Sequence, residues 1–425
     1  MSFRSWLQRA TVLACCFPAI SIAQEASQTQ TPTSEPPKSW IDPGTGHRVV
    51  RLTSEPGSAS LYFHQNAFTG DQREMVYTTP QGISVLDLKT LATRPVVEGG
   101  RAIVTGRHSQ NVYYMKEGAV FSTDVDTGAT RLIAKLAQRG SIDTVNADET
   151  LLAGTYVEGS GQDYRGDRSQ QTHSLDQPLN KGQMMEQRLA AHLPMALFVI
   201  DAKTGEPRTI LKSTDWLNHL QFSPTDPTLL MFCHEGPWHK VERIWTIRTD
   251  GSQLTKVHNR TMAMEIFGHE SWSADGKTIW YDLQTPRGED FWLAGYEVAR
   301  GSRTWYHLQR NEWSVHFNSS PDGTLFAGDG GDEGQVAHAP DGRWIYLFRP
   351  ELIENRDVQD AALIRPGVLR AERLVDMSRH QYRLEPNVSF TPDQQWIVFR
   401  SNMFGASYVF AVEVAKASGT PPDRR

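Results

Sequence analysis

A short turn pattern that recurs along the chain constrains its fold more than any other feature of the sequence. Each copy typically holds a small residue, a Pro or Ala and an Asp, often with a Gly, and an apolar, β-rich run follows. Proline presets one turn position, Asp bonds to its own backbone and Gly adopts a positive φ, so each copy predicts a hairpin turn that leads into a strand. The copies lie at residues 69–71, 146–148, 223–226, 273–276, 320–323 and 391–393, with a weaker one at 107–109.

A second type of turn follows the apolar runs, as at residues 126–128, 203–205 and 249–251. Two hairpins in each unit of about 40–50 residues are typical of a four-stranded propeller blade. The seven copies therefore predict an all-β, seven-bladed β-propeller that forms a single domain over residues 39–425, with a long polar insertion near 157–190. Several separate β-sandwiches are the alternative, but no linker-like change of composition after residue 38 favours them.

The first residues have the pattern of a secretory signal peptide. Arg4 and Arg9 precede an apolar run at 10–20, and the small residues at 21–23 are typical of a cleavage site. We therefore expect residues 1–23 to be a cleaved signal peptide and residues 24–38, which are polar and Pro-rich, to be a flexible leader. The mature protein is expected in the periplasm or outside the cell, with Cys233 as its one remaining cysteine and hence no internal disulfide.

The composition excludes several classes of protein. Of the 425 residues, 39% are hydrophobic and 22% charged, which is usual for a globular chain and not for a collagen-like, disordered or multi-span membrane protein. A net charge of -6 without a long basic run argues against nucleic acid as a partner. The apolar run at 10–20 is too short to span a membrane. We expect a monomer or a small homo-oligomer with no membrane span.

Polar residues recur at one position of the turn pattern. The residues six positions before the turn Asp, or before its equivalent, are Gln65, His219, His269, His316 and Asn387. The strand before this turn is the innermost strand of its blade, so these side chains are expected to meet across the central cavity, with His64 beside them and Glu385 on the same strand face as Asn387. Such imidazoles, amides and carboxylates suit a metal ion or an anionic substrate. The alternative is a polar channel lining without chemistry.

A second polar cluster lies at residues 233–238, with the sequence CHEGPW. Its Gly and Pro predict a sharp turn at the end of a strand, which would present His234 and Glu235 at the mouth of the cavity. Arg243, at the start of the next strand run, is suited to pairing with a carboxylate. A structural turn with Arg243 in a salt bridge is the alternative. Cys233 is interpreted as a small core residue and not as a nucleophile.

Several of these segments resemble the oligogalacturonate lyase family. The similarity lies in residues 215–245 with the HEGP motif, in 268–272 (GHESW), in 314–332 with the GDG motif and in 42–53, and it covers most of the mature chain. The resemblance implies a seven-bladed propeller that cleaves short uronic-acid oligosaccharides by β-elimination with a divalent metal, usually manganese. It also implies that His316 is a metal ligand, His269 a catalytic-site histidine and Arg243 the base.

The chain departs from the family pattern before its last turn. The family supplies a glutamine and a His-x-His pair there, whereas Glu385 and Asn387 replace the two histidines in this chain, and Gln381 or Tyr382 replaces the glutamine. Together with His316, such an oxygen-rich set would favour Mn²⁺, Mg²⁺ or Ca²⁺. Loss of metal binding and a different substrate are the other interpretations of this departure.

The proposed chemistry leaves the role of two residues open. Elimination from a uronide needs a base at C5 and a neutralised carboxylate. A guanidinium normally stays protonated, so His269 as base with Arg243 on the carboxylate is easier than Arg243 as base, and both assignments are kept. A non-catalytic carbohydrate-binding or scaffold propeller is the rival class, and a glycoside hydrolase is a third. The residues expected to bind the oligosaccharide are His64, Gln65, His219, His234 and Glu235.

Overall fold

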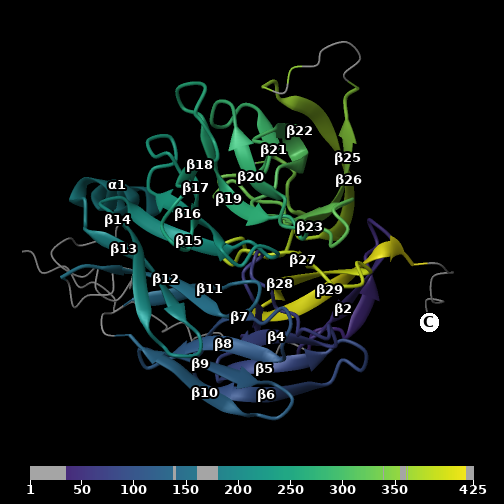
Figure 1. Ribbon diagram of the computed structural model, residues 1–425. Helices are drawn as coiled ribbons and strands as arrows, with labels where there is room; N and C mark the ends of the chain where they lie inside the picture. The colour runs from purple at the N-terminus through teal and green to yellow at the C-terminus, as the bar shows by residue number, and fades with distance from the viewer. Residues whose placement is uncertain are drawn as a thin grey trace, which may run out of the picture. The chain divides into compact units, whose positions relative to one another are not determined.

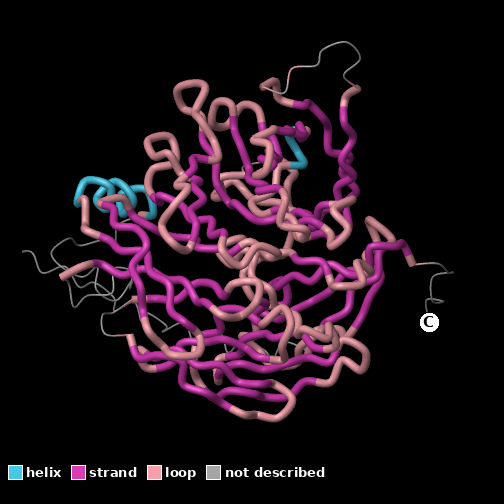
Figure 2. The backbone as a smooth tube through the Cα atoms, viewed as in Figure 1, coloured by secondary structure: helices cyan, strands magenta, loops and turns pink. Residues whose placement is uncertain are grey.

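The recurring turns end one strand and begin the next, as predicted. At the turn of residues 273–276, the Asp275 carboxylate accepts bonds from the Ser273 hydroxyl (2.7 Å) and from the Lys277 N–H (3.1 Å). Gly276 follows with a φ of 68°, which a side chain would disfavour. The computed structural model describes residues 35–136, 140–159, 180–337, 339–354, 360 and 362–417. Within these ranges strands predominate, and Figure 2 shows how little of the backbone is helical.

Four antiparallel four-stranded sheets form the first part of the fold (Figure 1). The first is β3 (Ala59–Ser60), β4 (Glu74–Thr79), β5 (Gly82–Asp87) and β6 (Thr93–Glu98). The second is β7 (Arg101–Thr105), β8 (Asn111–Lys116), β9 (Ala119–Asp124) and β10 (Thr130–Lys135). The third is β11 (Ser141–Val145), β12 (Leu151–Val157), β13 (Met195–Asp201) and β14 (Pro207–Ser213). The fourth is β15 (Trp216–Phe222), β16 (Leu229–Glu235), β17 (Ile244–Arg248) and β18 (Thr255–Lys256).

The next two blades join through their outer strands into one eight-stranded sheet, because β22 pairs with β26 in parallel. The fifth blade is β19 (Ile266–Trp272), β20 (Thr278–Gln284), β21 (Phe291–Glu297) and β22 (Arg303–Leu308). The sixth is β23 (Phe317–Ser319), β24 (Phe326–Gly328), β25 (Trp344–Leu352) and β26 (Arg365–Asp376). A turn at residues 340–342, with the sequence PDG, leads into β25.

The last blade combines the two ends of the described chain. It consists of β27 (Ser389–Phe390), β28 (Trp396–Phe404) and β29 (Ala406–Lys416), to which the early strands β2 (His47–Arg51) and β1 (Ser39–Ile41) are added. Val49 of β2 lies opposite Val412 of β29, so the N-terminal strands complete the blade that the C-terminal strands begin. The described residues thus form seven blades, and the predicted all-β, seven-bladed propeller is confirmed.

The hydrophobic core lies between the faces of neighbouring blades. One apolar cluster joins Met75 and Val85 of the first blade to Val112 of the second and to Val398 and Val409 of the last. Because each sheet is covered on both faces by its neighbours, the middle strands β5 and β16 are buried over nearly their whole length. The same packing brings the innermost strands of adjacent blades side by side.

Two helices accompany the strands in the described residues. The 3₁₀ helix spans Arg310–Glu312, and α1 (Lys181–Ala191) belongs to the long insertion and begins with a capping box between Asn180 and Gln183. Neither helix has the length and apolar composition that a membrane crossing requires. The predicted signal peptide, most of the predicted leader and residues 160–179 of the insertion lie outside the described residues.

Candidate active site

The position that repeats in the sequence also repeats in the backbone. His219, His269 and Asn387 all have a left-handed conformation, with φ of 49°, 45° and 54°. For the two histidines this conformation coincides with a β-bulge, in β15 between Asn218 and Gln221 and in β19 between Gly268 and Ser271. A bulge redirects a side chain out of the regular pleat and is common beside active sites. The inner strands β15 and β19 therefore each contain a bulge that redirects one histidine side chain, His219 in β15 and His269 in β19.

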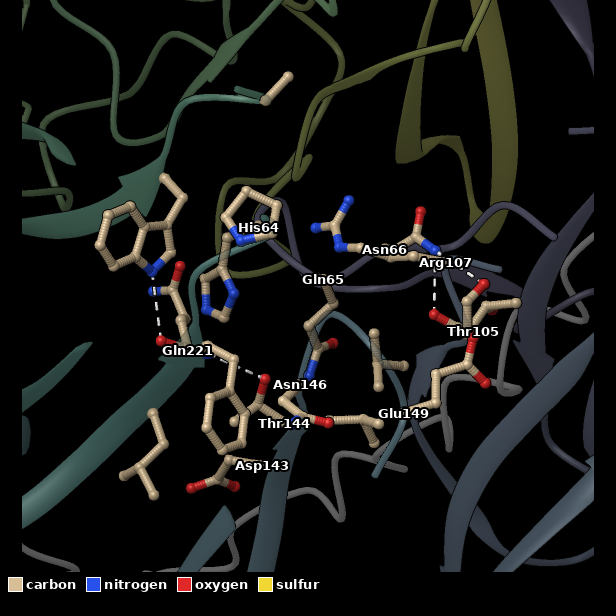
Figure 3. A pocket seen from close by; sticks show the side chains of 18 of the residues that line it. His64, Gln65, Asn66, Thr105, Arg107, Asp143, Thr144, Asn146, Glu149 and Gln221 are labelled. Carbon is tan, nitrogen blue, oxygen red and sulfur yellow. Dashed lines mark hydrogen bonds between the residues drawn. The ribbon is translucent and has the colours of Figure 1, made fainter. Parts of the chain in front are cut away.

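His219 and His269 lie in the wall of a cavity of about 370 Å³. The predicted residues that line it are His64, Gln65, His219, Glu235, Arg243, His269 and Glu385. Figure 3 shows a second, smaller cavity of about 70 Å³, which shares His64, Gln65 and Asp143 with the first. The two cavities thus share part of their walls, and the larger one of the two is the candidate active site.

Arg243 is a buried cation held by two buried carboxylates. Its Nη1 donates to Glu235 Oε1 at 2.7 Å, its Nε donates to Glu270 Oε2 at 3.2 Å, and the guanidinium lies 4.8 Å from the centre of the Trp238 ring. Burial alone would lower the pKa of Arg243, but its acidic neighbours, the Glu235 and Glu270 carboxylates among them, raise this pKa well above its ordinary value. Arg243 therefore stays protonated, and its Nη2 bonds to no other described residue.

His269 is a buried imidazole with one nitrogen engaged. Its Nδ1 lies 3.3 Å from Asp282 Oδ2, and its ring meets the Trp238 ring edge-on at 5.0 Å. Burial first, and then the charge of His316, lowers the pKa of His269 well below its ordinary value. Burial raises the pKa of Asp282 to about 7. No described group bonds to His269 Nε2, so a neutral imidazole nitrogen is available on the cavity side.

His316 is fully buried and held by a carboxylate. Asp329 accepts the His316 backbone N–H at 2.9 Å, and its other oxygen lies 2.7 Å from Nδ1. The Tyr382 hydroxyl in turn donates to the Asp329 carbonyl (3.1 Å). His316 Nε2 lies 3.1 Å from the Tyr62 hydroxyl and 3.9 Å from Glu385 Oε2. An imidazole fixed by a carboxylate on one nitrogen is the usual arrangement of a metal-ligating histidine.

Besides the fully buried His316, three predicted residues are not part of the cavity lining. Asn387 is buried and uses its amide locally, since Oδ1 accepts the Phe63 N–H (3.3 Å) and Nδ2 donates to the Glu385 carbonyl (3.1 Å). Gln381 is exposed, and its backbone bonds to Asn402. His234 was expected at the cavity mouth, but it packs against Trp245 on the opposite side of β16 from Glu235, because side chains alternate along a strand.

A further cluster of possible metal donors is already engaged. His219, Cys233 and Glu235 bring donor atoms within 4.8 Å of one another. However, His219 Nε2 lies 3.1 Å from Glu235, whose other oxygen is bonded to Arg243. Burial raises the pKa of the Cys233 thiol well above its ordinary value, which keeps it neutral. The donors that best suit a metal are therefore His316 and Glu385.

Sequence reasoning missed several residues that support the site. Asp329 lies in the GDG segment that carried the family resemblance, so its motif was recognised but its role was not. Trp238 and Glu270 lie in the CHEGPW and GHESW motifs, so their motifs were recognised but their contacts with Arg243 were not. Tyr62 and Asp282 gave no such signal, because Tyr62 meets His316 from a distant blade and Asp282 meets His269 only through the pairing of β19 with β20.

Comparisons with known proteins show the family to which the chain is similar. Residues 36–418 match the family described as oligogalacturonate lyase. The oligogalacturonate lyase of Dickeya dadantii is 27% identical over 400 residues, which are 88% of this chain and 95% of the relative. The oligogalacturonide lyase of Pectobacterium atrosepticum is also 27% identical, over 398 residues and the same shares of each chain.

Among solved structures, an oligogalacturonate lyase in complex with manganese superposes with a TM-score of 0.71 at 23% identity. This similarity covers 89% of this chain and 96% of that one, and it shows a shared fold. The oligogalacturonate lyase of Vibrio parahaemolyticus gives a TM-score of 0.70 at 22% identity, over the same shares. The family match spans nearly the whole described chain, and the protein belongs to the oligogalacturonate lyase family.

Proposed function

We propose that this protein cleaves uronic-acid oligosaccharides of the oligogalacturonate type by metal-assisted β-elimination. The observation that carries the proposal is the pairing, within one cavity, of a cation that cannot lose its proton with an imidazole that is neutral. Arg243 is the cation and His269 the imidazole. The names of the two curated relatives support the choice of substrate.

In the proposed reaction His269 Nε2 removes the proton from C5 of the uronate. The electron pair of that bond forms the C4–C5 double bond, and the bond between C4 and the glycosidic oxygen breaks. The leaving oxygen takes up a proton from water, and His269 later returns its proton to the solvent, so the products are an unsaturated uronide and a shortened oligosaccharide. Asp282, beside Nδ1, stabilises the imidazolium that forms on His269.

Arg243 is assigned to the carboxylate and not to proton abstraction. The C5 proton becomes acidic only when the neighbouring carboxylate is neutralised, and a fixed guanidinium does this without giving up a proton. Glu235 and Glu270 fix two of the three guanidinium nitrogens, which leaves Nη2 to bind the substrate. Of the two assignments left open by the sequence, the structure thus favours His269 as the base.

His316 and Glu385 are the residues that would hold a divalent ion. Their donor atoms lie 3.9 Å apart, Asp329 already orients the imidazole, and the nitrogen–carboxylate set suits manganese. An ion at Nε2 would replace the Tyr62 hydroxyl as the partner of His316. When bound, such an ion would supply further positive charge to the substrate carboxylate. The manganese complex of a similar fold supports this choice of metal.

Metal content and product formation test the proposal together. Purified protein with added Mn²⁺ should release an ultraviolet-absorbing unsaturated uronide from trigalacturonate, and a chelator should suppress the release. The variants His316→Ala and Glu385→Ala should each lose metal while remaining folded, and Gln381→Ala, at an exposed position, serves as the control. Unchanged metal content in both variants would exclude these ligands. Absence of unsaturated product with the parental protein would favour a non-catalytic carbohydrate-binding propeller.

We also propose that the protein acts in the periplasm or outside the cell. The support is the charged, apolar and small-residue pattern of residues 1–23. Sequencing the N-terminus of the protein purified from its own host tests this. We expect the chain to begin after Ala23, and a mature chain that begins at Met1 would contradict the proposal.

A further inference from the structure

The insertion between β12 and β13 contributes a lysine to the active-site cavity. Lys181 is the first residue of α1, and its side chain lines the same cavity as Arg243 and His269. The positive charge of Lys181 is one of the smaller causes, after burial and His316, that lower the pKa of His269. Lys181 is therefore close enough to the reacting groups to act on a substrate bound there.

Contacts with the fourth blade fix the position of α1. Glu186 pairs with Lys240, whose Nζ lies 2.7 Å from Oε1, and Lys240 follows the CHEGPW segment that carries Trp238. The Arg188 guanidinium lies 4.2 Å from the centre of the Trp216 ring, at the start of β15. Figure 1 shows α1 beside the third and fourth blades. The helix is thus attached to the two elements that also place Glu235 and Arg243.

Lys181 differs from the two arginines that line the cavity in having no bonded partner among the described residues. Arg243 is already balanced by Glu235 and Glu270, and Arg101 donates to the Ile142 carbonyl. The Lys181 ammonium, by contrast, forms no bond with any other residue in the described part of the chain. An oligouronide carries one carboxylate on each sugar, so a substrate whose reacting carboxylate faces Arg243 brings a second negative charge close by.

We propose that Lys181 binds the carboxylate of the uronate next to the one that is cleaved, and so selects substrates that are charged on both sugars. This inference rests on the proposed function. An ammonium on a flexible stem acts as a point charge, so it accommodates a carboxylate without demanding one geometry. The Lys181 ammonium would stabilise the bound substrate and the transition state equally. Its removal is therefore expected to raise KM more than it lowers kcat.

The first test replaces the lysine and compares two substrates. Lys181→Met should raise KM for trigalacturonate roughly two- to five-fold, as expected for the loss of an exposed ion pair, with little change in kcat. With trigalacturonate whose non-reacting carboxylates are methyl-esterified, the variant and the parental protein should have the same KM. Lys203→Met, at an exposed turn between β13 and β14, removes the same charge elsewhere and should change neither KM.

A second variant tests whether the docking of α1 matters. Glu186→Gln weakens the ion pair with Lys240, so it should raise KM in the parental background. In the Lys181→Met background, Glu186→Gln should have no further effect on KM, because α1 then no longer positions the Lys181 ammonium. Additive effects, an unchanged KM in Lys181→Met, or an equal rise in KM for both substrates would each overturn the inference.

Calorimetric binding separates this inference from the proposed function. If the parental protein binds trigalacturonate but forms no unsaturated product, the proposed reaction is wrong. Weaker binding of trigalacturonate by Lys181→Met would still support the role of Lys181 in binding the substrate. If both proteins bind trigalacturonate equally, the inference is wrong even where the reaction occurs. If the parental protein neither binds nor cleaves it, both are overturned.

Discussion

At the scale of single residues, the site is built from ionisable groups whose protonation is set by burial. Burial alone would raise the pKa of Glu235, but Arg243 and then His219 lower this pKa well below its ordinary value. The same arrangement keeps Arg243 protonated, whereas burial keeps His269 neutral. An elimination from a carboxylate requires a positively charged group and an uncharged base at the same pH, and Arg243 and His269 have these two protonation states.

Arg243→Lys tests the cation's geometry. Lysine keeps the positive charge but has no planar fork, so it cannot serve Glu235, Glu270 and a substrate at once. We expect kcat/KM to fall by about 10²-fold or more, as for a misplaced reacting group. The free energy of unfolding is also expected to fall, because a buried carboxylate loses a bond. Near-parental kcat/KM in this variant would show that the reaction does not need the planar guanidinium of Arg243.

The pH dependence of kcat/KM tests His269 as the base. A base must be unprotonated to act, and the lowered pKa of His269 keeps it unprotonated as the pH falls through its ordinary value of about 6.5. The acidic limb of the profile should therefore lie below this pH, and His269→Ala should lower kcat by about 10²–10⁴-fold. A limb at or above the ordinary value, or a His269→Ala variant that retains its turnover, would contradict the assignment.

At the scale of elements, a bulge and a glycine together position His269 and Arg243, the two groups proposed to act on the substrate. Gly268 precedes the bulge in β19, and the Trp238 ring lies against it, so a Cβ at this position would sit 2.8 Å from a ring atom. The same ring covers Arg243 and contacts His269. The absence of a side chain at residue 268 thus allows the CHEGPW loop to approach the inner strand of the next blade.

Gly268→Ala is expected to displace Trp238 and, with it, Arg243 and His269. We predict at least about a ten-fold loss of kcat/KM, since small displacements of reacting groups have large effects on rate. Gly44→Ala is the matched control, because its added Cβ would lie 3.4 Å from the nearest atom, an ordinary contact. Equal activity in both variants, measured as the rate of product formation, would show that Trp238 does not position the site.

The sequence predicted the elements better than the contacts. The turn motifs placed the inner strands, and counting back from them found His219, His269 and His316, because a repeated blade repeats its register. The same count selected Asn387, which has the expected backbone but turns its amide onto Phe63. Gln381 was chosen by the family pattern alone and is exposed. Register predicts where a backbone position lies, but not which neighbour its side chain will bond.

At the scale of the whole molecule, stability depends on closing the ring of blades. The last blade is completed by β1 and β2, so its sheet joins residues from the beginning and the end of the described chain. Val49 of β2 is fully buried in the cluster that also holds Val412 and Phe410 of β29. Packing across this closure therefore links the first described strands to the last.

Val49→Ala tests the closure. Removing two buried methyl groups should lower the free energy of unfolding by about 1–3 kcal/mol in chemical denaturation. Val50→Ala, the neighbouring half-buried position on the other face of β2, is the control and should cost less. Equal effects of the two changes would show that the β2–β29 interface does not contribute more than an ordinary surface.

The central claim, that the carbon–oxygen bond is broken by elimination, is tested most directly by the origin of the oxygen atoms in the products. Trigalacturonate is incubated with the protein and Mn²⁺ in water labelled with heavy oxygen, and the masses of the products are measured by mass spectrometry. Elimination uses no water, so we predict an unsaturated fragment and a saturated fragment, neither of which gains heavy oxygen in the cleavage step. A saturated pair of fragments, one of them carrying a solvent oxygen, would identify a hydrolase and contradict the account.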